Sequence, residues 1–454
     1  MMRIRSLVLL LIALIAAPLF AARGTADFTR FVVIGDSYGA GVESASLNVN
    51  HQQFSWPAVI ARQAGAGDFQ QPLVSFPGIG PELQLVDVIH FPPTILPASN
   101  TNGQPINLNL PRPYNNLAVP GANVADVITL TGKESATSTA KAFAQFILRG
   151  LGTEVQQALA QQPTFIAVWI GGNDALGSVL AGTPALLTPL DAFKTSYNTM
   201  LDQLTAGAPN AGIVVGTIPN NVRALPILTT VPPVIINPQT RQPLLINGAP
   251  VPLIADLGGG NIGPLPTGSL VLLTAATKVA SGFGIPPQLA QMPPFNQFPN
   301  AGKPLADTDV LTPTEAAAIG QRVDDFNTVI QQAASQRNIP VADIKGLFDR
   351  IAAGMNIGPI VINGSFITGG AFSLDGFHMT DIGYTLFADE YIKAINGAYG
   401  TRIPLAPVTD FEQNNILTAS GLIFVPGSEW EMSREAEDQI RTFAPTIMRR
   451  HVVH

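Results

Sequence analysis

The sequence contains no cysteine, few charged residues and no strongly basic region. Of its 454 residues, 12% are Asp, Glu, Lys or Arg, whereas about 25% is typical of soluble proteins. The absence of cysteine excludes disulfides, thiolate zinc sites, iron–sulfur clusters, a cysteine nucleophile and a lipid-modified cysteine. The net charge of −7, with no basic cluster, argues against nucleic acid as the main partner. Because 46% of the residues are hydrophobic, a globally disordered chain is also excluded.

The N-terminus has the pattern of an export signal. Arg3 and Arg5 precede an apolar run over residues 7–20, and two alanines follow it. The run is shorter than the roughly 20 residues that a membrane span needs. We therefore expect residues 1–22 to be a cleaved signal peptide, and the mature protein to be secreted, periplasmic or on the cell surface. An uncleaved N-terminal anchor is the alternative.

Short apolar runs alternate with segments that carry a helical pattern. The runs cover residues 31–34, 165–170, 213–218 and 340–343, and the helical segments cover 54–63, 124–130, 140–160, 191–204, 312–336 and 380–395. Thr312 and Glu315 form a capping box with proline at the first helical position, and Gly397 is expected to close the last helix. Strands that alternate with helices predict an α/β fold with a parallel sheet covered on both faces.

Two segments interrupt this alternation. Residues 65–115 and 219–310 are rich in the chain's 42 glycines and 39 prolines. A structureless loop as long as 219–310 is uncommon inside a compact domain, so we expect an ordered accessory lobe or lid there. A disordered linker is the alternative, which the many Ile, Leu and Val residues disfavour. Residues 401–454 form a C-terminal extension of unknown role.

A serine and a histidine stand in positions suited to nucleophilic catalysis. Ser37 lies in GDSYGAG, directly after the first strand, and ligand sites in open parallel sheets lie at the carboxyl ends of strands. His378 follows Asp375 by three residues, so the carboxylate can bond the imidazole Nδ1 and leave Nε2 as a base. Taken singly, the first pattern also fits a strand-to-helix turn with a capping serine, and the second fits a surface turn.

Two further segments could stabilise an oxyanion. Gly121 ends the run NNLAVPGA, and Asn173 lies in GGND directly after the second strand. A tetrahedral intermediate needs two or three hydrogen-bond donors aimed at its oxygen. The backbone N–H groups of Ser37 and Gly121 and the side-chain amide of Asn173 could supply them.

In this order, the four segments resemble the SGNH hydrolase superfamily, also called the GDSL esterases and lipases. The matching positions are Ser37, Gly121, Asn173 and His378, and Asp375 completes the triad. The resemblance implies a three-layer α/β/α sandwich with a parallel, flavodoxin-like sheet, spanning residues 23–400 with both insertions looped out of it. Tyr38 stands where the motif's name places Leu, and the insertions leave substrate size and the need for a lid open.

The resemblance also implies an activity and a set of partners. Ser37 would attack a carboxylic ester, His378 would act as the base, and an acyl-enzyme would form and hydrolyse. Asp36 and Asp174 are similar to aspartates that hold the motif loops, and we expect neither a metal nor a cofactor. The expected substrate is a small-molecule or lipid ester, which leaves transient contact with a membrane or lipid surface open. No obligate protein partner is evident.

Other functions remain open at this point. The same site could deacetylate polysaccharides, or the scaffold could be an inactive surface-binding protein. A nucleotide- or flavin-binding protein of flavodoxin type is a third reading, which Asp36 disfavours because it would repel a phosphate. We expect His51 and His90 on the surface or in loops, and Trp56 and Trp169 in the core. Residues 286–298 could form an apolar acyl-binding wall or simply pack as a loop.

Overall fold

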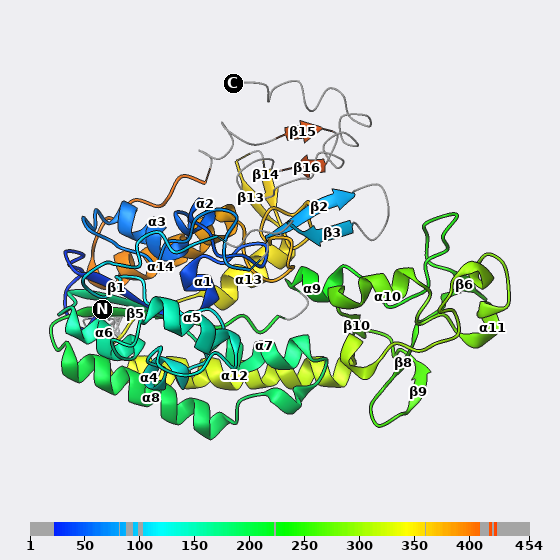
Figure 1. The fold of residues 1–454 in the computed structure, drawn as a ribbon, viewed down its shortest axis with the longest axis horizontal. Coiled ribbons are helices and arrows are strands. Elements are labelled where there is room, and N and C mark those ends of the chain that lie inside the picture. Colours follow the sequence, from blue (N-terminus) through cyan, green and yellow to red (C-terminus); the bar gives the residue numbers. More distant parts are fainter. Residues whose placement is uncertain are drawn as a thin grey trace, which may run out of the picture.

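A parallel sheet lies at the centre of the computed structural model (Figure 1). The structure describes residues 22–80, 82–87, 94–98, 103–221, 224–358 and 360–408, together with strand residues 417–419 and 422–424. The expected signal peptide up to residue 21, His90 and most of the C-terminal extension lie outside these ranges. Among the described residues, no helix combines the length and apolar character needed to cross a bilayer.

The central sheet has the strand order β1-β4-β5-β12, and all neighbours run parallel. The extended residues 115–119 continue it beside β1, because the N–H of Leu117 donates to the carbonyl of Val33 at 2.9 Å. Every residue of β1, β4 and β5 is buried, which explains why these strands are continuous apolar runs. The strands are β1 (Phe31–Gly35), β4 (Phe165–Trp169), β5 (Gly212–Gly216) and β12 (Val341–Ala342).

Helices cover both faces of this sheet (Figure 1). Alternate strand residues face different cores, so that Val32 belongs to one and Val33 to the other. One face is covered by α4 (Asp126–Thr129), α5 (Thr139–Ile147), α6 (Glu154–Ala160), α8 (Leu190–Gly207) and α12 (Pro313–Ser335), and the other by α3 (Trp56–Gln63), α13 (Ile344–Ala353) and α14 (Asp381–Tyr399). The predicted α/β/α sandwich is therefore confirmed.

The predicted helix boundaries are mostly, but not entirely, correct. The Thr312 capping box is present at the start of α12. The single helix predicted over 140–160 is wrong, because Arg149 (φ 54°) and Gly152 (φ 126°) break it into α5 and α6. Helix α14 begins after Thr380 as predicted but continues past Gly397 to Tyr399.

The region between α3 and α4 is mostly irregular. It carries one antiparallel hairpin of β2 (Leu83–Asp87) and β3 (Thr94–Pro97). Two short helices precede α3, namely α1 (Ser37–Ala40) and α2 (Val49–Gln52). Trp56 in α3 and Trp169 in β4 are buried in one core, as predicted.

Residues 231–310 form a lobe beside the sandwich and have a hydrophobic core of their own (Figure 1). Phe295 is buried within that core, so residues 286–298 pack the lobe itself. The base of the lobe packs on the body, where Leu270 and Leu272 share a cluster with Ile319 of α12. The lobe contains the hairpins β6–β7 (Leu245–Ile246, Ala249–Pro250) and β8–β9 (Ile254–Asp256, Ile262–Pro264), and helices α10 (Ala276–Ala280) and α11 (Pro287–Ala290). It joins the body through α9 (Pro226–Thr229) and the pair β10–β11 (Leu270–Val271, Val310–Leu311).

Two further strand pairs and one α-helix belong to the described chain. Strands β13 (Met355–Ile357) and β14 (Ile360–Ile362) form a hairpin after α13. Strands β15 (Leu417–Ala419) and β16 (Leu422–Phe424) pair in the C-terminal extension. Helix α7 (Asn173–Leu180) follows β4 and, as shown below, borders the candidate site.

Candidate active site

Ser37 lies at the carboxyl end of β1, where the strand turns into α1. The carboxylate of Asp36 caps this helix by accepting the N–H of Tyr38 at 3.0 Å, and Gly41 ends it at φ 81°. Ser37 is the first helical residue, so its own N–H has no partner within the helix. The short turn therefore fixes the serine at the sheet edge with a free backbone donor.

Asp375 and His378 form a buried pair in the turn before α14. The imidazole Nδ1 lies 2.8 Å from Oδ2 of Asp375, and the N–H of His378 donates to Oδ1 at 2.8 Å. Burial alone would raise the pKa of Asp375, but His378 and the N–H of Phe377 hold this pKa below its ordinary value. The ionised carboxylate thus places the imidazole proton on Nδ1 and leaves Nε2 as an acceptor.

The turn that bears Ser37 contacts the turn that bears His378, but Nε2 of His378 and the Ser37 hydroxyl are not hydrogen-bonded within the described residues. Nε2 of His378 is buried and makes no hydrogen bond within the described chain. The connection runs through Tyr38, whose hydroxyl donates to the carbonyl of Phe377 and whose ring centroid lies 5.6 Å from that of His378. Catalytic hydrogen bonds often tighten only when substrate binds, so the missing contact does not by itself exclude joint action of Ser37 and His378.

The predicted oxyanion donors gather at the same sheet edge. Gly121 follows the extended residues 115–119 with φ 84°. The Asn173 amide, at the start of α7, donates to the carbonyl of Ala122 at 2.9 Å and to Oδ2 of Asp36 at 3.4 Å. The segments bearing these donors thus end on three neighbouring strands of the sheet.

Asp36 and Asp174 support the motif loops through hydrogen bonds. Besides capping α1, Asp36 holds the amide of Asn173. Oδ2 of Asp174 accepts the N–H of Val124 at 3.0 Å. Burial raises the pKa of Asp36 well above its usual value and that of Asp174 to about 6. Through these contacts Asp36 links α1 to Asn173, and Asp174 links α7 to Val124.

Three contributors to the site were not predicted. Tyr38 packs against both Trp169 and His378, although its place next to Ser37 could have drawn attention to it. Ala45, with φ 63°, donates its N–H to Oδ2 of Asp375 at 2.9 Å. The buried Glu154 accepts the N–H of Gly35 at 2.9 Å. The sequence around it looks like any helix that begins with an acidic residue, so it could not be singled out.

His51 is not on the surface, contrary to prediction. It lies in α2, is buried, and contacts Glu43, Glu82 and Asp381. The prediction was wrong because these carboxylates come from distant segments that the local sequence does not reveal.

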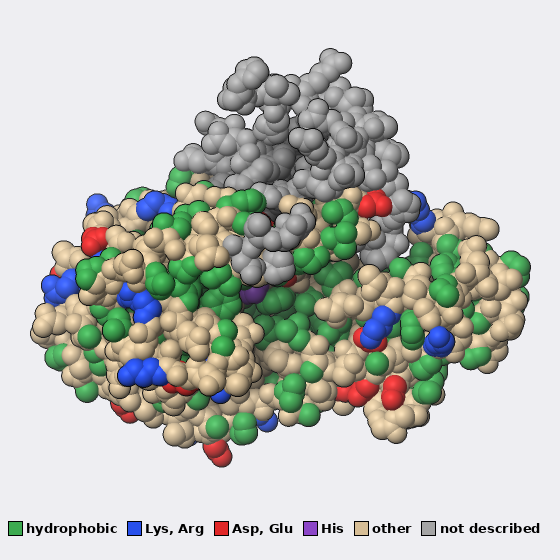
Figure 2. Space-filling model, viewed as in Figure 1, with side chains coloured by type: hydrophobic (Ala, Val, Ile, Leu, Met, Phe, Trp, Pro, Cys, Tyr) green, Lys and Arg blue, Asp and Glu red, His purple; other side chains and the backbone are tan. Residues whose placement is uncertain are grey.

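A mainly apolar cavity adjoins Ser37. It lies between α7 and α12, and no residue of 286–298 lines it. Figure 2 shows hydrophobic side chains and a histidine in a recess between the body and the lobe. Besides Asp36, Ser37, Tyr38 and Asn173, the lining includes Leu176, Val179, Ile218, Leu225, Ile319, Val323, Phe348 and Phe377.

Comparison with known proteins identifies the family. The family model described as GDSL-like Lipase/Acylhydrolase matches residues 31–391. None of the curated proteins compared gives a significant match.

Several solved structures are similar to the chain. One is the family 3 carbohydrate esterase of Clostridium thermocellum (12% identity, 82% of this chain and 96% of that chain, TM-score 0.33). Another is a variant of an acetyl xylan esterase from Geobacillus stearothermophilus (13% identity, 82% of this chain and 96% of that chain, TM-score 0.34). A third is an alpha/beta hydrolase enzyme from the metagenome of Lake Arreo, Spain (13% identity, 84% of this chain and 99% of that chain, TM-score 0.33).

The family match spans more than half of the chain and includes Ser37, Gly121, Asn173, Asp375 and His378. The chain therefore belongs to the GDSL-like lipase/acylhydrolase family of SGNH hydrolases.

Proposed function

We propose that the protein is an exported serine esterase that hydrolyses carboxylic esters through Ser37, His378 and Asp375. The observation that carries this proposal is the buried Asp375–His378 pair, whose Nε2 is left free beside the turn that bears Ser37. A structural histidine in the core normally uses both ring nitrogens, because an unpaired buried polar atom is costly.

The proposed reaction begins with a small change of side-chain rotamers that brings the Ser37 hydroxyl to Nε2 of His378. Nε2 takes the hydroxyl proton as the oxygen attacks the ester carbonyl, and the imidazolium then protonates the departing alkoxide. Water repeats both steps on the acyl-enzyme, which releases the acid and restores the serine. Asp375 stays ionised and stabilises the imidazolium throughout.

The oxyanion would be held by the backbone N–H groups of Ser37 and Gly121 and by the amide of Asn173. Both amide protons of Asn173 already have acceptors, at 2.9 Å and 3.4 Å. The longer bond, to Asp36, is the weaker one, so we propose that this proton turns to the oxyanion when substrate binds.

The acyl group would enter the apolar cavity beside Ser37. The cavity measures about 70 Å³, on a scale where one water needs about 10–15 Å³. This space suits an acyl chain of a few carbons. The apolar walls therefore favour acyl chains longer than acetyl, and polysaccharide O-deacetylation remains the alternative.

Labelling with a fluorophosphonate probe tests the nucleophile. The wild-type chain should be labelled at Ser37, and Ser37→Ala should lose both labelling and esterase activity. Ser178→Ala is the matched control, because it removes a buried hydroxyl on α7 that makes no hydrogen bond to the residues the structure describes. Folded wild-type protein that takes no label, or equal labelling of Ser37→Ala, would exclude the proposed mechanism and favour an inactive surface-binding protein.

A further inference from the structure

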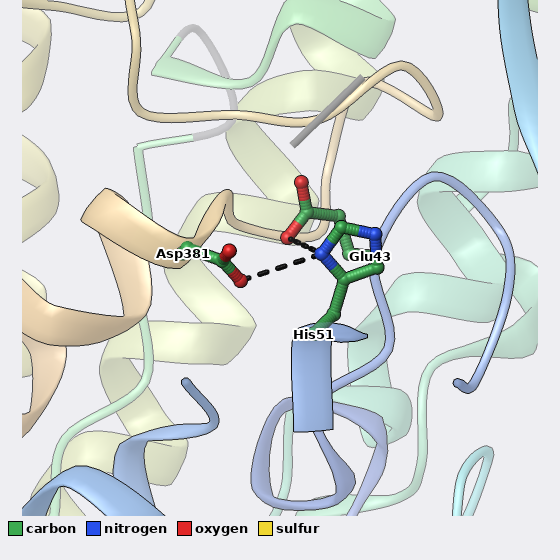
Figure 3. Close-up of side chains that lie close together, drawn as sticks. All are labelled: Glu43, His51 and Asp381. Atoms are coloured by element: carbon green, nitrogen blue, oxygen red, sulfur yellow. Dashed lines mark hydrogen bonds and ion pairs between the residues drawn. The ribbon is translucent and has the colours of Figure 1, made fainter. Parts of the chain in front are cut away.

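A second group of chemically reactive side chains lies buried away from the ester site. Glu43, His51 and Asp381 come from the loop after α1, from α2 and from the first turn of α14. Their exposed fractions are 0%, 2% and 0%, so water does not solvate their charges. Figure 3 shows both carboxylates approaching the same ring nitrogen of His51.

The spacing of these atoms resembles that of ligands around a shared ion. Nδ1 of His51 lies 3.2 Å from Oε2 of Glu43 and 3.4 Å from Oδ1 of Asp381. A charge-assisted N–H···O bond is shorter, about 2.7–2.9 Å. Nitrogen and oxygen ligands about 2.0–2.1 Å from a tetrahedral zinc lie about 3.3–3.4 Å from each other. Both measured separations fall close to that edge length.

The other face of the imidazole supplies an independent observation. Nε2 of His51 lies 3.0 Å from Oε1 of Glu82, and the amide of Asn48 donates to the second oxygen of Glu82 at 3.3 Å. A metal-bound histidine usually donates its remaining N–H to a carboxylate in this way. With the proton on Nε2, the Nδ1 lone pair points at two carboxylate oxygens, and a cation bound among these three buried acceptors would stabilise them.

We propose that Glu43, His51 and Asp381 bind a zinc ion. The absence of cysteine excludes thiolate zinc sites, whereas this donor set of one imidazole and two carboxylates is one that zinc accepts. Glu43 follows Ser37 by six residues, and Asp381 follows His378 by three. The ion therefore acts as a structural staple between the nucleophile segment and the histidine segment, and takes no part in bond cleavage.

A proton is the competing cation. Burial opposes a charge on His51, but Glu43, Asp381 and Glu82 together hold the pKa of its imidazole well above the usual value. An imidazolium could therefore donate to all three carboxylates without any metal. The nearby Arg62, in α3, also interacts electrostatically with Asp381. Metal binding and this protonated state differ in composition, so an elemental analysis separates them.

The test measures metal content and thermal stability of the full chain. Protein purified without chelators and dialysed against zinc should retain about one zinc per chain by mass spectrometry, and EDTA should remove the ion and lower the Tm. Glu43→Gln and Asp381→Asn should each lose the zinc. Asp389→Asn, which changes another carboxylate on α14, should retain it.

The zinc content and Tm of the wild-type protein test the proposal even if a variant fails to fold. Retention of less than about a tenth of a zinc ion per chain, with no change of Tm on adding zinc, would overturn the proposal in favour of an imidazolium. Retention of calcium alone would overturn the assignment to zinc. Ser37→Ala should bind zinc normally, so that a failure of the proposed esterase mechanism and a failure of the metal site remain distinguishable.

Discussion

Ala45 and Asp375 lie 330 residues apart, yet the N–H of Ala45 donates to Oδ2 of Asp375 at 2.9 Å. The same oxygen binds Nδ1 of His378 at 2.8 Å. The carboxylate that orients the proposed base is therefore also the anchor for the loop that follows the nucleophile helix. Because one group serves both purposes, any change to Asp375 should affect the alignment of both segments as well as the imidazole tautomer.

The first prediction concerns this carboxylate. In Asp375→Asn the uncharged amide can no longer fix the proton on Nδ1 or stabilise the imidazolium, so kcat for ester hydrolysis should fall about 10,000-fold. Steady-state kinetics on a soluble ester measure the loss. Asp202→Asn, which alters an exposed carboxylate on α8, should leave kcat unchanged. A fall of less than about tenfold in Asp375→Asn would contradict the proposed role.

The second prediction concerns Asp174 and the dependence of stability on pH. Burial raises its folded-state pKa to about 6, above the ordinary Asp pKa of 3.8 that applies in the unfolded chain. Protonated Asp174 therefore stabilises the folded state below about pH 4, and this contribution is lost as pH rises towards 6. At about 1.4 kcal/mol per pKa unit, the contribution is at most about 3 kcal/mol. Asp174→Asn should flatten the pH profile of the unfolding free energy between pH 4 and 6.

Denaturant titrations at several pH values measure that profile. Asp191→Asn is a suitable control, because Asp191 is an exposed carboxylate at the start of α8. If Asp174→Asn and wild type keep the same slope between pH 4 and 6, the raised pKa has been assigned to the wrong group.

The third prediction uses the glycine inside the histidine turn. Gly376 has φ 78°, and a Cβ there would lie 2.8 Å from the backbone nitrogen of Ile227 in α9. Gly376→Ala should therefore destabilise the protein by at least about 1–2 kcal/mol through the left-handed backbone alone, and should also push α9 away from the site. Thermal unfolding and ester kinetics report the two effects.

Gly397→Ala provides a control of opposite sign. Gly397 lies within α14, has open space around it and has no positive φ. Alanine there should stabilise the helix by about 0.8–1.0 kcal/mol. Equal effects of the two substitutions would show that the close approach to Ile227 does not constrain the turn.

The sequence predicts the sheet correctly, and it places the candidate site residues after the strands, because both depend on local patterns. Buried parallel strands are continuous apolar runs, and the residues after them are fixed by short motifs around Ser37 and Asn173. The end of α14 was misplaced because Gly397 fits inside a helix that is held by tertiary packing. The break between α5 and α6 was missed because Arg149 adopts a left-handed conformation that the sequence does not mark.

The burial of His51 could not be predicted for a different reason. Its partners Glu82 and Asp381 lie 31 and 330 residues away along the chain. Only the fold brings their charges together, so no spacing rule within one segment would reveal the cluster. The position of Tyr38 between Trp169 and His378 likewise depends on three separate strands and turns.

The last prediction concerns the length of the acyl chain. Val179 lines the cavity beside Ser37 and is buried on α7, whereas its neighbour Leu180 is 39% exposed. Val179→Phe should fill part of the cavity and reduce kcat/KM for octanoyl esters by at least about tenfold relative to acetyl esters, because a few methylene groups are worth about 0.8 kcal/mol each when buried.

A panel of p-nitrophenyl esters from acetyl to palmitoyl measures this ratio, and Leu180→Phe adds the same ring to the outer face of α7 as a control. In the wild-type chain, kcat/KM should peak at an intermediate length, because the cavity is apolar but narrow. A wild-type preference for acetyl over every longer ester would contradict the proposed preference for longer acyl chains and favour deacetylation. An unchanged octanoyl-to-acetyl ratio in Val179→Phe would show that the acyl chain does not enter this cavity.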